Sequence, residues 1–499
     1  IATESPKWLP ENCIQCNQCN FVCPHATIRA KQIDPKDLAG APAGFTTIPS
    51  NTKNDRGLLY REQVYIEDCV GCGSCAQVCP AKTKALVMTP IAELRAAGEA
   101  AKAEFFDKLP DNVLDGVKPD TLKGSQFLRP LFEFSGACAG CGETPYVKLA
   151  TQLYGDRMII ANATGCSSIY GGTFPTSPYC VNAEGKGPAW GNSLFEDNAE
   201  YGFGMRLAVD ANRRLLAASI DAVLAAGTTP ALTDALQKMK GAWAGVGEEA
   251  KAAAKAVRAA LPKALESADG ARPHLAKVDE LKDFLVEKSV WCIGGDGWAY
   301  DIGYGGLDHV LAMNRNVNVL VLDTEVYSNT GGQASKATPT GSVAKFAASG
   351  KKTSKKDLGR MAMTYGYIYV ASVAMGANMN QCLRAFLEAE AYPGPSLIIA
   401  YSPCINHGID MSKSQAEQKL AVDTGYWINY RFNPLLAKEG KNPLQLDSKE
   451  PKLEYQDFLK NETRYKTLVQ QYPDIAKELF ARAAEESRKR YASYKKMAE

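Results

Sequence analysis

Eight of the fifteen cysteines fall into two runs of identical spacing, C-x2-C-x2-C-x3-C-P. The first run is Cys13, Cys16, Cys19 and Cys23, and the second is Cys69, Cys72, Cys75 and Cys79. Tight turns bring the first three sulfurs of a run to three corners of a cubane, and the fourth cysteine ligates the other cluster. One [4Fe–4S] cluster is therefore expected on Cys13, Cys16, Cys19 and Cys79, and another on Cys69, Cys72, Cys75 and Cys23. Structural zinc is the alternative, but zinc sites do not repeat this four-cysteine spacing.

Residues 1–115 are accordingly predicted to form a ferredoxin-like domain with two [4Fe–4S] clusters. Residues 31–63 separate the two cysteine runs by more than a compact ferredoxin needs, which predicts an inserted loop. Residues 91–125 are polar and rich in alanine, and they are expected to form a linker with one helix. His25 follows Cys23-Pro24 and is expected to pack beside a cluster rather than to ligate it.

Composition excludes several classes of function. The net charge is +2 with 22% charged residues, so no basic surface argues for nucleic acid or for an anionic membrane. The apolar runs at 317–322 and 397–400 are far too short to span a bilayer. No segment resembles a secretory signal, and retained thiolates favour a reducing compartment, so a cytoplasmic location is expected.

A second feature is the stretch 290–332, which predicts a strand, a glycine-rich turn, a helix, a second strand and a loop. Asp296 and Thr324 follow the two strands, at the edge where open α/β sheets bind ligands. A carboxylate, a hydroxyl and the carbonyl of Val326 would supply hard oxygens to Mg²⁺ and leave positions for phosphate oxygens and water. The dinucleotide pattern fails because Tyr300 stands where it needs glycine. Gly-Asp-Gly by itself also occurs as a simple turn in an α/β core.

A third group of cysteines comprises Cys138, Cys141 and Cys166, with Glu143 close by. A cubane needs a fourth ligand, and the candidates are Cys180, Cys292, Cys382 and Cys404. Cys292 and Cys382 lie in apolar segments, as core thiols do. Cys404 follows the predicted strand 397–400 and lies at the same sheet edge as Asp296, so it is the predicted ligand. A zinc site remains open on spacing alone.

Gly-Asp-Gly followed by an oxygen ligand about thirty residues later resembles the thiamine diphosphate motif, with Thr324 where asparagine is usual. The variant DTEVYSNTGGQ at 323–333 resembles the pyruvate:ferredoxin (flavodoxin) oxidoreductase family. So do C-x2-C-G-E from Cys138, T-G-C-S around Cys166, S-P-C-I-N-H-G around Cys404, and GPAWGNSLFEDNAEYGFG at 187–204. This resemblance covers essentially the whole chain.

The resemblance implies that residues 116–499 form a doubly wound α/β domain that binds thiamine diphosphate and Mg²⁺ beside a third [4Fe–4S] cluster on Cys138, Cys141, Cys166 and Cys404. Asn329 would lie near the reacting carbon as a catalytic residue. The implied cofactor-binding residues are Glu143, Cys166, Gly295, Asp296, Gly297, Trp298, Thr324, Glu325, Val326, Tyr327, Ser328 and Asn329. The implied magnesium ligands are Asp296, Thr324 and Val326.

By the same resemblance, the expected activity is reversible oxidative decarboxylation of pyruvate to acetyl-CoA and CO2. Electrons would pass through three clusters to ferredoxin or flavodoxin. The chain would be the C-terminal portion of a single-chain enzyme, would need the N-terminal domains for turnover, and is expected to form a homodimer. The alternatives are another 2-oxo acid such as 2-oxoglutarate or an aryl pyruvate, a non-redox thiamine lyase, or an electron-transfer module. The complete set of Asp296, Thr324 and Asn329 argues against the last.

Alanine-rich segments at 205–226, 231–244 and 248–266 predict helices that cover the sheet, as an insertion at about 205–287. The tail 465–499 is expected to form a charged helical segment that lies on the surface or against a partner. His407, beside Cys404, is expected to be structural rather than an acid or base.

Overall fold

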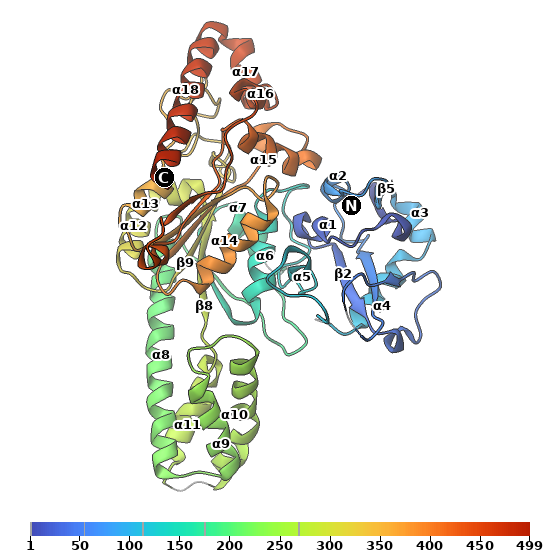
Figure 1. Ribbon diagram of the computed structural model, residues 1–499, viewed down its shortest axis with the longest axis vertical. Coiled ribbons are helices and arrows are strands. Elements are labelled where there is room, and N and C mark those ends of the chain that lie inside the picture. The colour runs from blue at the N-terminus through green and yellow to red at the C-terminus, as the bar shows by residue number, and fades with distance from the viewer. Residues whose placement is uncertain (1, 54, 112–113, 174–175, 268–269) are drawn as a thin grey trace.

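The computed structural model describes residues 2–53, 55–111, 114–173, 176–267 and 270–499. Its centre is an eight-stranded sheet with the order β13-β12-β10-β11-β9-β8-β6-β7 (Figure 1). The six strands from β10 to β7 are parallel, and β12 and β13 add antiparallel pairs at one edge. The strands are β6 (Met158–Asn162), β7 (Ala189–Asn192), β8 (Ser289–Gly295), β9 (Asn318–Asp323), β10 (Tyr369–Val373), β11 (Ser396–Tyr401), β12 (Tyr430–Phe432) and β13 (Leu444–Leu446).

Each central strand is apolar on both sides, because helices cover both faces of the sheet. In β9, Val319 and Val321 point into one core, whereas Leu320 and Leu322 point into the other. Helices α6 (Thr144–Tyr154) and α14 (Met379–Ala391) pack on the second face. The first face is covered by α8 (Asn198–Ala226), α12 (Tyr304–Ala312) and α13 (Leu358–Met363). The predicted doubly wound α/β fold is confirmed.

The ferredoxin-like part lies beside α6 (Figure 1). It consists of β1 (Glu4–Trp8) paired with β5 (Leu86–Pro90), the sheet of β2 (Ile28–Ile33), β4 (Leu59–Val64) and β3 (Ile48–Pro49), and helices α1 (Gln18–Val22) and α2 (Ser74–Val78). The expectation of a plain inserted loop at 31–63 is wrong in part, because β3 and β4 of this segment pair with each other.

The expected linker with one helix is also wrong. The segment contains three helices, α3 (Ile91–Ala96), α4 (Glu99–Lys108) and α5 (Leu122–Ser125). Leu94 of α3 and Phe106 of α4 are 2% and 0% exposed, so these two helices bury apolar side chains against the ferredoxin-like part. The mostly polar composition of this segment did not indicate that a few large apolar side chains are buried.

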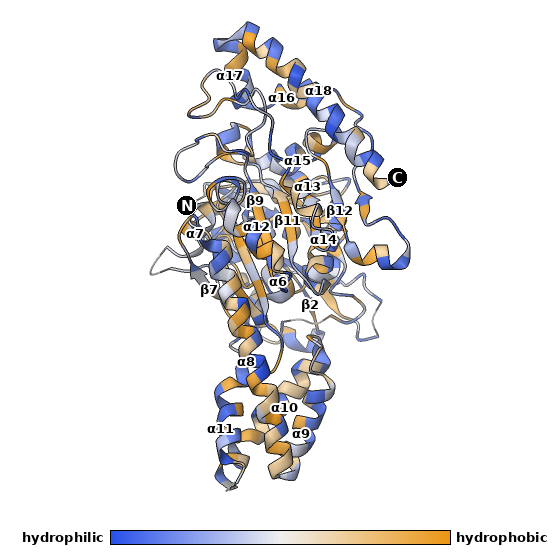
Figure 2. Ribbon diagram, turned by 90° about the vertical axis from the view of Figure 1, so that its left-hand side faces the viewer, coloured by the Kyte–Doolittle hydropathy of each residue, from blue (hydrophilic) through white to orange (hydrophobic). Residues whose placement is uncertain are grey.

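The helical insertion consists of the outer part of α8 with α9 (Pro230–Gly241), α10 (Glu248–Ser267) and α11 (Arg272–Leu281). The predicted helices are present, but the expectation that they cover the sheet is wrong. They project away from it as a bundle, into which α8 runs directly from the sheet (Figures 1 and 2). The bundle has a core of its own, which includes Leu216, Leu236 and Leu261.

The C-terminal segment forms α15 (Ser414–Asp423), α16 (Tyr455–Leu459), α17 (Thr463–Gln471) and α18 (Pro473–Ala498). The predicted helical segment of the tail consists of two helices, because the chain turns at Tyr472 before Pro473. Tyr494 of α18 is buried and stacks on Tyr430, with ring centroids 4.7 Å apart. Over the described ranges no helix combines the length and the apolar character needed to cross a membrane.

Candidate cofactor pocket and iron–sulfur sites

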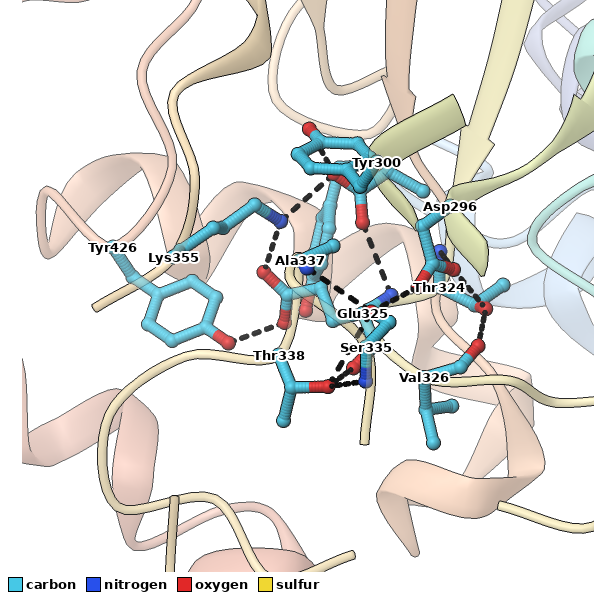
Figure 3. A network of polar contacts seen from close by, with 12 residues as sticks. Asp296, Tyr300, Thr324, Glu325, Val326, Ser335, Ala337, Thr338, Lys355 and Tyr426 are labelled. Atoms are coloured by element: carbon cyan, nitrogen blue, oxygen red, sulfur yellow. Dashed lines mark hydrogen bonds and ion pairs between the residues drawn. The ribbon is translucent and has the colours of Figure 1, made fainter. Parts of the chain in front are cut away.

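The predicted metal ligands meet where β8 and β9 end side by side. Thr324 donates from its backbone N–H and its hydroxyl to Oδ1 of Asp296, at 3.2 and 3.0 Å. The same hydroxyl lies 2.9 Å from the carbonyl oxygen of Val326. Asp296 and Thr324 are 1% and 2% exposed, so these oxygens are shielded from bulk water (Figure 3).

This set of oxygens fits a magnesium ion. A threonine hydroxyl carries one proton, so it cannot donate to the Asp296 carboxylate and the Val326 carbonyl at once. Oxygens bound at about 2.1 Å in an octahedral Mg²⁺ site are about 3 Å apart, and the two measured spacings are 3.0 and 2.9 Å. Burial, followed by the nearby charge of Asp323, raises the pKa of Asp296 to about 8. A cation would offset this cost of a buried carboxylate.

The second oxygen of Asp296 is held by a residue that belongs to none of the motifs in the sequence. Ser335 donates its hydroxyl to Oδ2 of Asp296 at 2.5 Å, across 39 positions of sequence. Thr338 anchors the same turn, accepting from the Ser335 N–H at 2.8 Å and donating to the carbonyl of Glu325 at 2.6 Å. The irregular segment between β9 and α13 therefore orients the Asp296 carboxylate through Ser335.

Glu325 is expected to bind the cofactor, but its carboxylate points toward Lys355 and Tyr426 (Figure 3). Lys355 bridges it to Asp323, with ion pairs of 2.9 and 2.8 Å, and Arg464 of α17 contacts its other oxygen at 2.8 Å. Burial opposes ionisation, yet the charges of Lys355 and Arg464 lower the pKa of Glu325 to about 2. The left-handed backbone of Glu325, with φ of 59°, is held by this network.

A pocket of about 370 Å³ opens at these oxygens. Eleven of the twelve predicted cofactor-binding residues line it, Glu325 being the exception: Glu143, Cys166, Gly295, Asp296, Gly297, Trp298, Thr324, Val326, Tyr327, Ser328 and Asn329. The Glu143 carboxyl is buried, and burial raises its pKa to about 7, an effect that the neighbouring Tyr170 hydroxyl opposes.

Glycine is needed at the two ends of the Gly-Asp-Gly turn for different reasons. A Cβ on Gly297 would lie 2.5 Å from the ring of Tyr327, so packing within the protein requires glycine there. A Cβ on Gly295 would meet only the carbonyl of Leu322, at 3.9 Å, and would instead enter the pocket. Gly295 therefore leaves room for a ligand that approaches the backbone closely.

The structure also shows two cavities lined by cysteines. The first cysteine cavity is lined by Cys13, Cys16, Cys19 and Cys79. The second cysteine cavity is lined by Cys23, Cys69, Cys72 and Cys75. These are the two sets that the spacing predicts, with the fourth cysteine of each run at the other cavity.

The third group of cysteines lies beside the cofactor pocket. Burial raises the pKa of the Cys166 thiol, and nearby charge at Glu143, Cys404 and Cys138 adds to the shift. Burial likewise raises the pKa of Cys141, with a contribution from Cys404. The other three candidates are elsewhere: Cys292 and Cys382 in the two sheet cores, and Cys180 near the carbonyl of Pro130. Ser328 links the group to the pocket, with Oγ 3.2 Å from Sγ of Cys166.

His407 and His25 are both buried, and each forms hydrogen bonds that link separate segments of the chain. Nε2 of His407 lies 2.8 Å from the carbonyl of Thr324, and Nδ1 accepts from the N–H of Cys404 at 3.4 Å. Burial lowers the pKa of His407 to about 3, so the ring is neutral. His25 lines the second cysteine cavity, and its ring nitrogens lie 3.0 and 3.2 Å from the carbonyls of Ser135 and Cys138.

Two family models match the chain. The one described as thiamine pyrophosphate enzyme, C-terminal TPP binding domain, matches residues 276–400. The one described as 4Fe-4S dicluster domain matches residues 12–83. A solved 2-oxoglutarate:ferredoxin oxidoreductase from Magnetococcus marinus aligns at 15% identity over 55% of this chain and 65% of that chain, but with a TM-score of only 0.33.

Curated relatives match over the full length of the chain. It is 58% identical over 503 residues to the pyruvate:ferredoxin oxidoreductase of Moorella thermoacetica, with 100% of this chain and 42% of that protein covered. It is 51% identical over 508 residues to the pyruvate-flavodoxin oxidoreductase of Trichormus variabilis, with the same two shares covered. The chain thus spans about two fifths of the length of the curated relatives it matches. With its dicluster and thiamine-binding domains, the chain belongs to the pyruvate:ferredoxin (flavodoxin) oxidoreductase family, and it corresponds to the C-terminal portion of such an enzyme.

Proposed function

We propose that the enzyme of which this chain forms part oxidatively and reversibly decarboxylates pyruvate, transfers the acyl group to coenzyme A and passes electrons to ferredoxin or flavodoxin. One observation carries this proposal. The buried oxygens of Asp296, Thr324 and Val326 lie in the same pocket as Cys166, whose thiol lies near Cys404 and Cys138, and Cys141 lies near Cys404 in turn.

In this proposal Asp296, Thr324 and the carbonyl of Val326 hold Mg²⁺, and Ser335 orients the carboxylate. Gly295 leaves space at the backbone, and the buried Trp298 closes the pocket against water. Asn329, exposed at the rim, would lie nearest the reacting carbon. Thiamine diphosphate, when bound, supplies the electron sink for decarboxylation of a 2-oxo acid.

Three [4Fe–4S] clusters would carry the electrons outward. Cys138, Cys141, Cys166 and Cys404 would hold the one nearest the pocket. The second cysteine cavity comes next, because His25 at its wall contacts the carbonyl of Cys138. The first cysteine cavity would then be the outermost and would face the external acceptor, since the exposed Ile14 lies in its wall.

The remaining parts of the enzyme are also proposals. The relatives are more than twice as long as this chain, so we propose that N-terminal domains complete the pocket and hold most contacts to the 2-oxo acid and coenzyme A. A homodimer is proposed for the complete enzyme.

The test is the visible absorbance of the complete anaerobic enzyme before and after pyruvate and then coenzyme A. Bleaching of the iron–sulfur band by pyruvate, with more on coenzyme A, is expected. Bleaching by 2-oxoglutarate but not by pyruvate would reassign the substrate. If dithionite bleaches the band and no 2-oxo acid does, the chain is an electron-transfer module and the proposal fails.

A further inference from the structure

Lys148 of α6 is a buried ammonium for which no carboxylate partner is found in the described part of the chain. Its side chain is 2% exposed. Its hydrogen-bond acceptors are two backbone carbonyls, those of Asn20 and of Phe21, the latter at 3.1 Å. A buried cation without an opposite charge is unfavourable, because the interior cannot replace its hydration. The fold therefore supplies a compensating charge or keeps the cation for a function.

The two carbonyls lie between the two cysteine cavities. Asn20 and Phe21 are in α1, directly after Cys19 of the first cavity and shortly before Cys23 of the second. Burial lowers the pKa of Lys148 to about 8, and the nearby thiols of Cys23 and Cys19 oppose that shift. The negative charge that acts on Lys148 therefore comes from the sulfurs of these cysteines.

Two other charged groups near Lys148, Arg29 and Glu62, already have partners of their own. Arg29, the nearest second cation, forms an ion pair with Glu133. The Glu62 carboxylate lies 3.7 Å from Sγ of Cys19 and accepts from the Tyr60 hydroxyl at 2.6 Å, whereas Lys148 donates to the carbonyls of Asn20 and Phe21. Among the described residues, Lys148 is thus a buried cation without an ion-pair partner at the junction of the two cavities.

We propose that Lys148 is the buried counter-charge of the two ferredoxin-like cluster sites and raises the reduction potentials of the clusters they hold. The inference rests on the proposed function, because it requires both cavities to hold clusters. Adding one electron to a cluster adds one negative charge, and a fixed ammonium in a medium of low dielectric constant favours that state.

The simpler role for Lys148 is structural, since its two acceptors are the last carbonyls of α1. The chain offers a matched control for that role. Lys84 donates to the carbonyls of Gln77 and Cys79 at the end of α2, at 3.0 and 2.7 Å, but it is exposed to solvent. Water screens its charge, so Lys84 shares the capping geometry without the electrostatic effect.

The experiment is an anaerobic redox titration of the complete enzyme, followed by electron paramagnetic resonance, with iron content measured on each sample. Lys148→Gln keeps hydrogen-bond donors and removes the charge, whereas Lys148→Arg keeps the charge. We expect Lys148→Gln to make at least one midpoint potential more negative by about 59 mV, a tenfold change for a one-electron couple. Lys148→Arg and Lys84→Gln should leave all potentials unchanged.

Loss of clusters in Lys148→Gln with retention in Lys148→Arg would equally support the counter-charge. Unchanged potentials in Lys148→Gln, or equal effects of Lys148→Gln and Lys148→Arg, would overturn the inference and leave a structural cap. Absence of iron–sulfur signals from the unsubstituted enzyme would overturn the proposed function as well, so the two failures are distinguishable.

Discussion

At the cofactor pocket, single oxygens determine what can bind. One proton serves three close oxygens on Asp296, Thr324 and Val326, and Ser335 fixes the remaining oxygen of the carboxylate. Groups that orient a metal ligand typically change metal affinity 10–100-fold when they are removed. The proposed metal site therefore depends on a serine that is not itself among the proposed ligands and does not line the pocket.

Replacing Ser335 tests this dependence. We expect Ser335→Ala to weaken Mg²⁺-dependent binding of thiamine diphosphate about tenfold, because Asp296 loses its hydrogen bond and is free to rotate. Calorimetric titration measures the affinity. Ser354→Ala is the matched control, because Ser354 belongs to the same segment and donates to Glu486 at 2.7 Å on the surface. Equal affinities for the two variants would refute the orienting role of Ser335.

The third cluster has its own test at Cys404. The intact enzyme is expected to hold about twelve iron atoms, four in each of three clusters. Cys404→Ala should reduce this to about eight, measured as iron per protein under anaerobic conditions. Cys180→Ala should keep about twelve, because Cys180 lies near the carbonyl of Pro130, away from the other three cysteines. Twelve irons in Cys404→Ala would identify another fourth ligand.

Among the elements, the bundle formed by α8–α11 is the one most independent of the site. Its apolar residues pack on one another, and the first part of α8 contacts the sheet, where Gly202 lies against Cys292. Lys251 of α10 adds an ion pair of 2.6 Å with Asp156, just before β6. A unit with a separate core can open without the rest. The bundle is therefore expected to unfold, and to exchange its amide hydrogens, independently of the sheet.

A cavity in the bundle tests this independence. Leu236 is 0% exposed, so Leu236→Ala should destabilise the bundle by about 2–5 kcal/mol. Hydrogen exchange should become faster in α8–α11 and stay unchanged in β8 and β9, with binding of thiamine diphosphate retained. Leu215→Ala, at a side chain 55% exposed, should have little effect. Faster exchange throughout the sheet would mean that bundle and sheet unfold as one unit.

For the whole molecule, the contrast is between a densely packed sheet and a ferredoxin-like part built around cavities. The sheet has two large apolar cores, whereas the ferredoxin-like part has several small ones next to the two cysteine cavities. Parts with small cores need metals or other links for stability.

Removing iron should therefore affect the two parts differently. After anaerobic chelation, exchange should rise in β1, β5, α1 and α2, while β8, β9 and β11 stay protected, because metal binding is coupled to folding only where the metal fills the interior. Hydrogen exchange with mass spectrometry measures both parts at once. Chelator-treated and untreated samples with the same exchange in α1 and α2 would rule this out.

Much of the site follows from the sequence, because it depends on local geometry. The spacing within each cysteine run sets which sulfurs converge, and the exchange of Cys23 and Cys79 between cavities follows from the same rule. Asp296 and Thr324 could be placed together because parallel strands end at one edge of a sheet. Cys404 follows a strand of that sheet in the same way.

Contacts between segments that are far apart in the chain could not be predicted from local spacing. Ser335 is 39 positions from Asp296, Arg464 is 139 from Glu325, and Lys148 is 128 from Asn20, and none of these residues belongs to a motif. An amphipathic pattern likewise shows that a helix buries one face but not what it packs against, so the insertion was wrongly expected to cover the sheet. The sequence by itself determined the cofactors' candidate ligands, since local spacing and strand order determine where those ligands lie. Only the tertiary structure decided which buried charges and hydroxyls surround them, because those depend on packing between segments far apart in the chain.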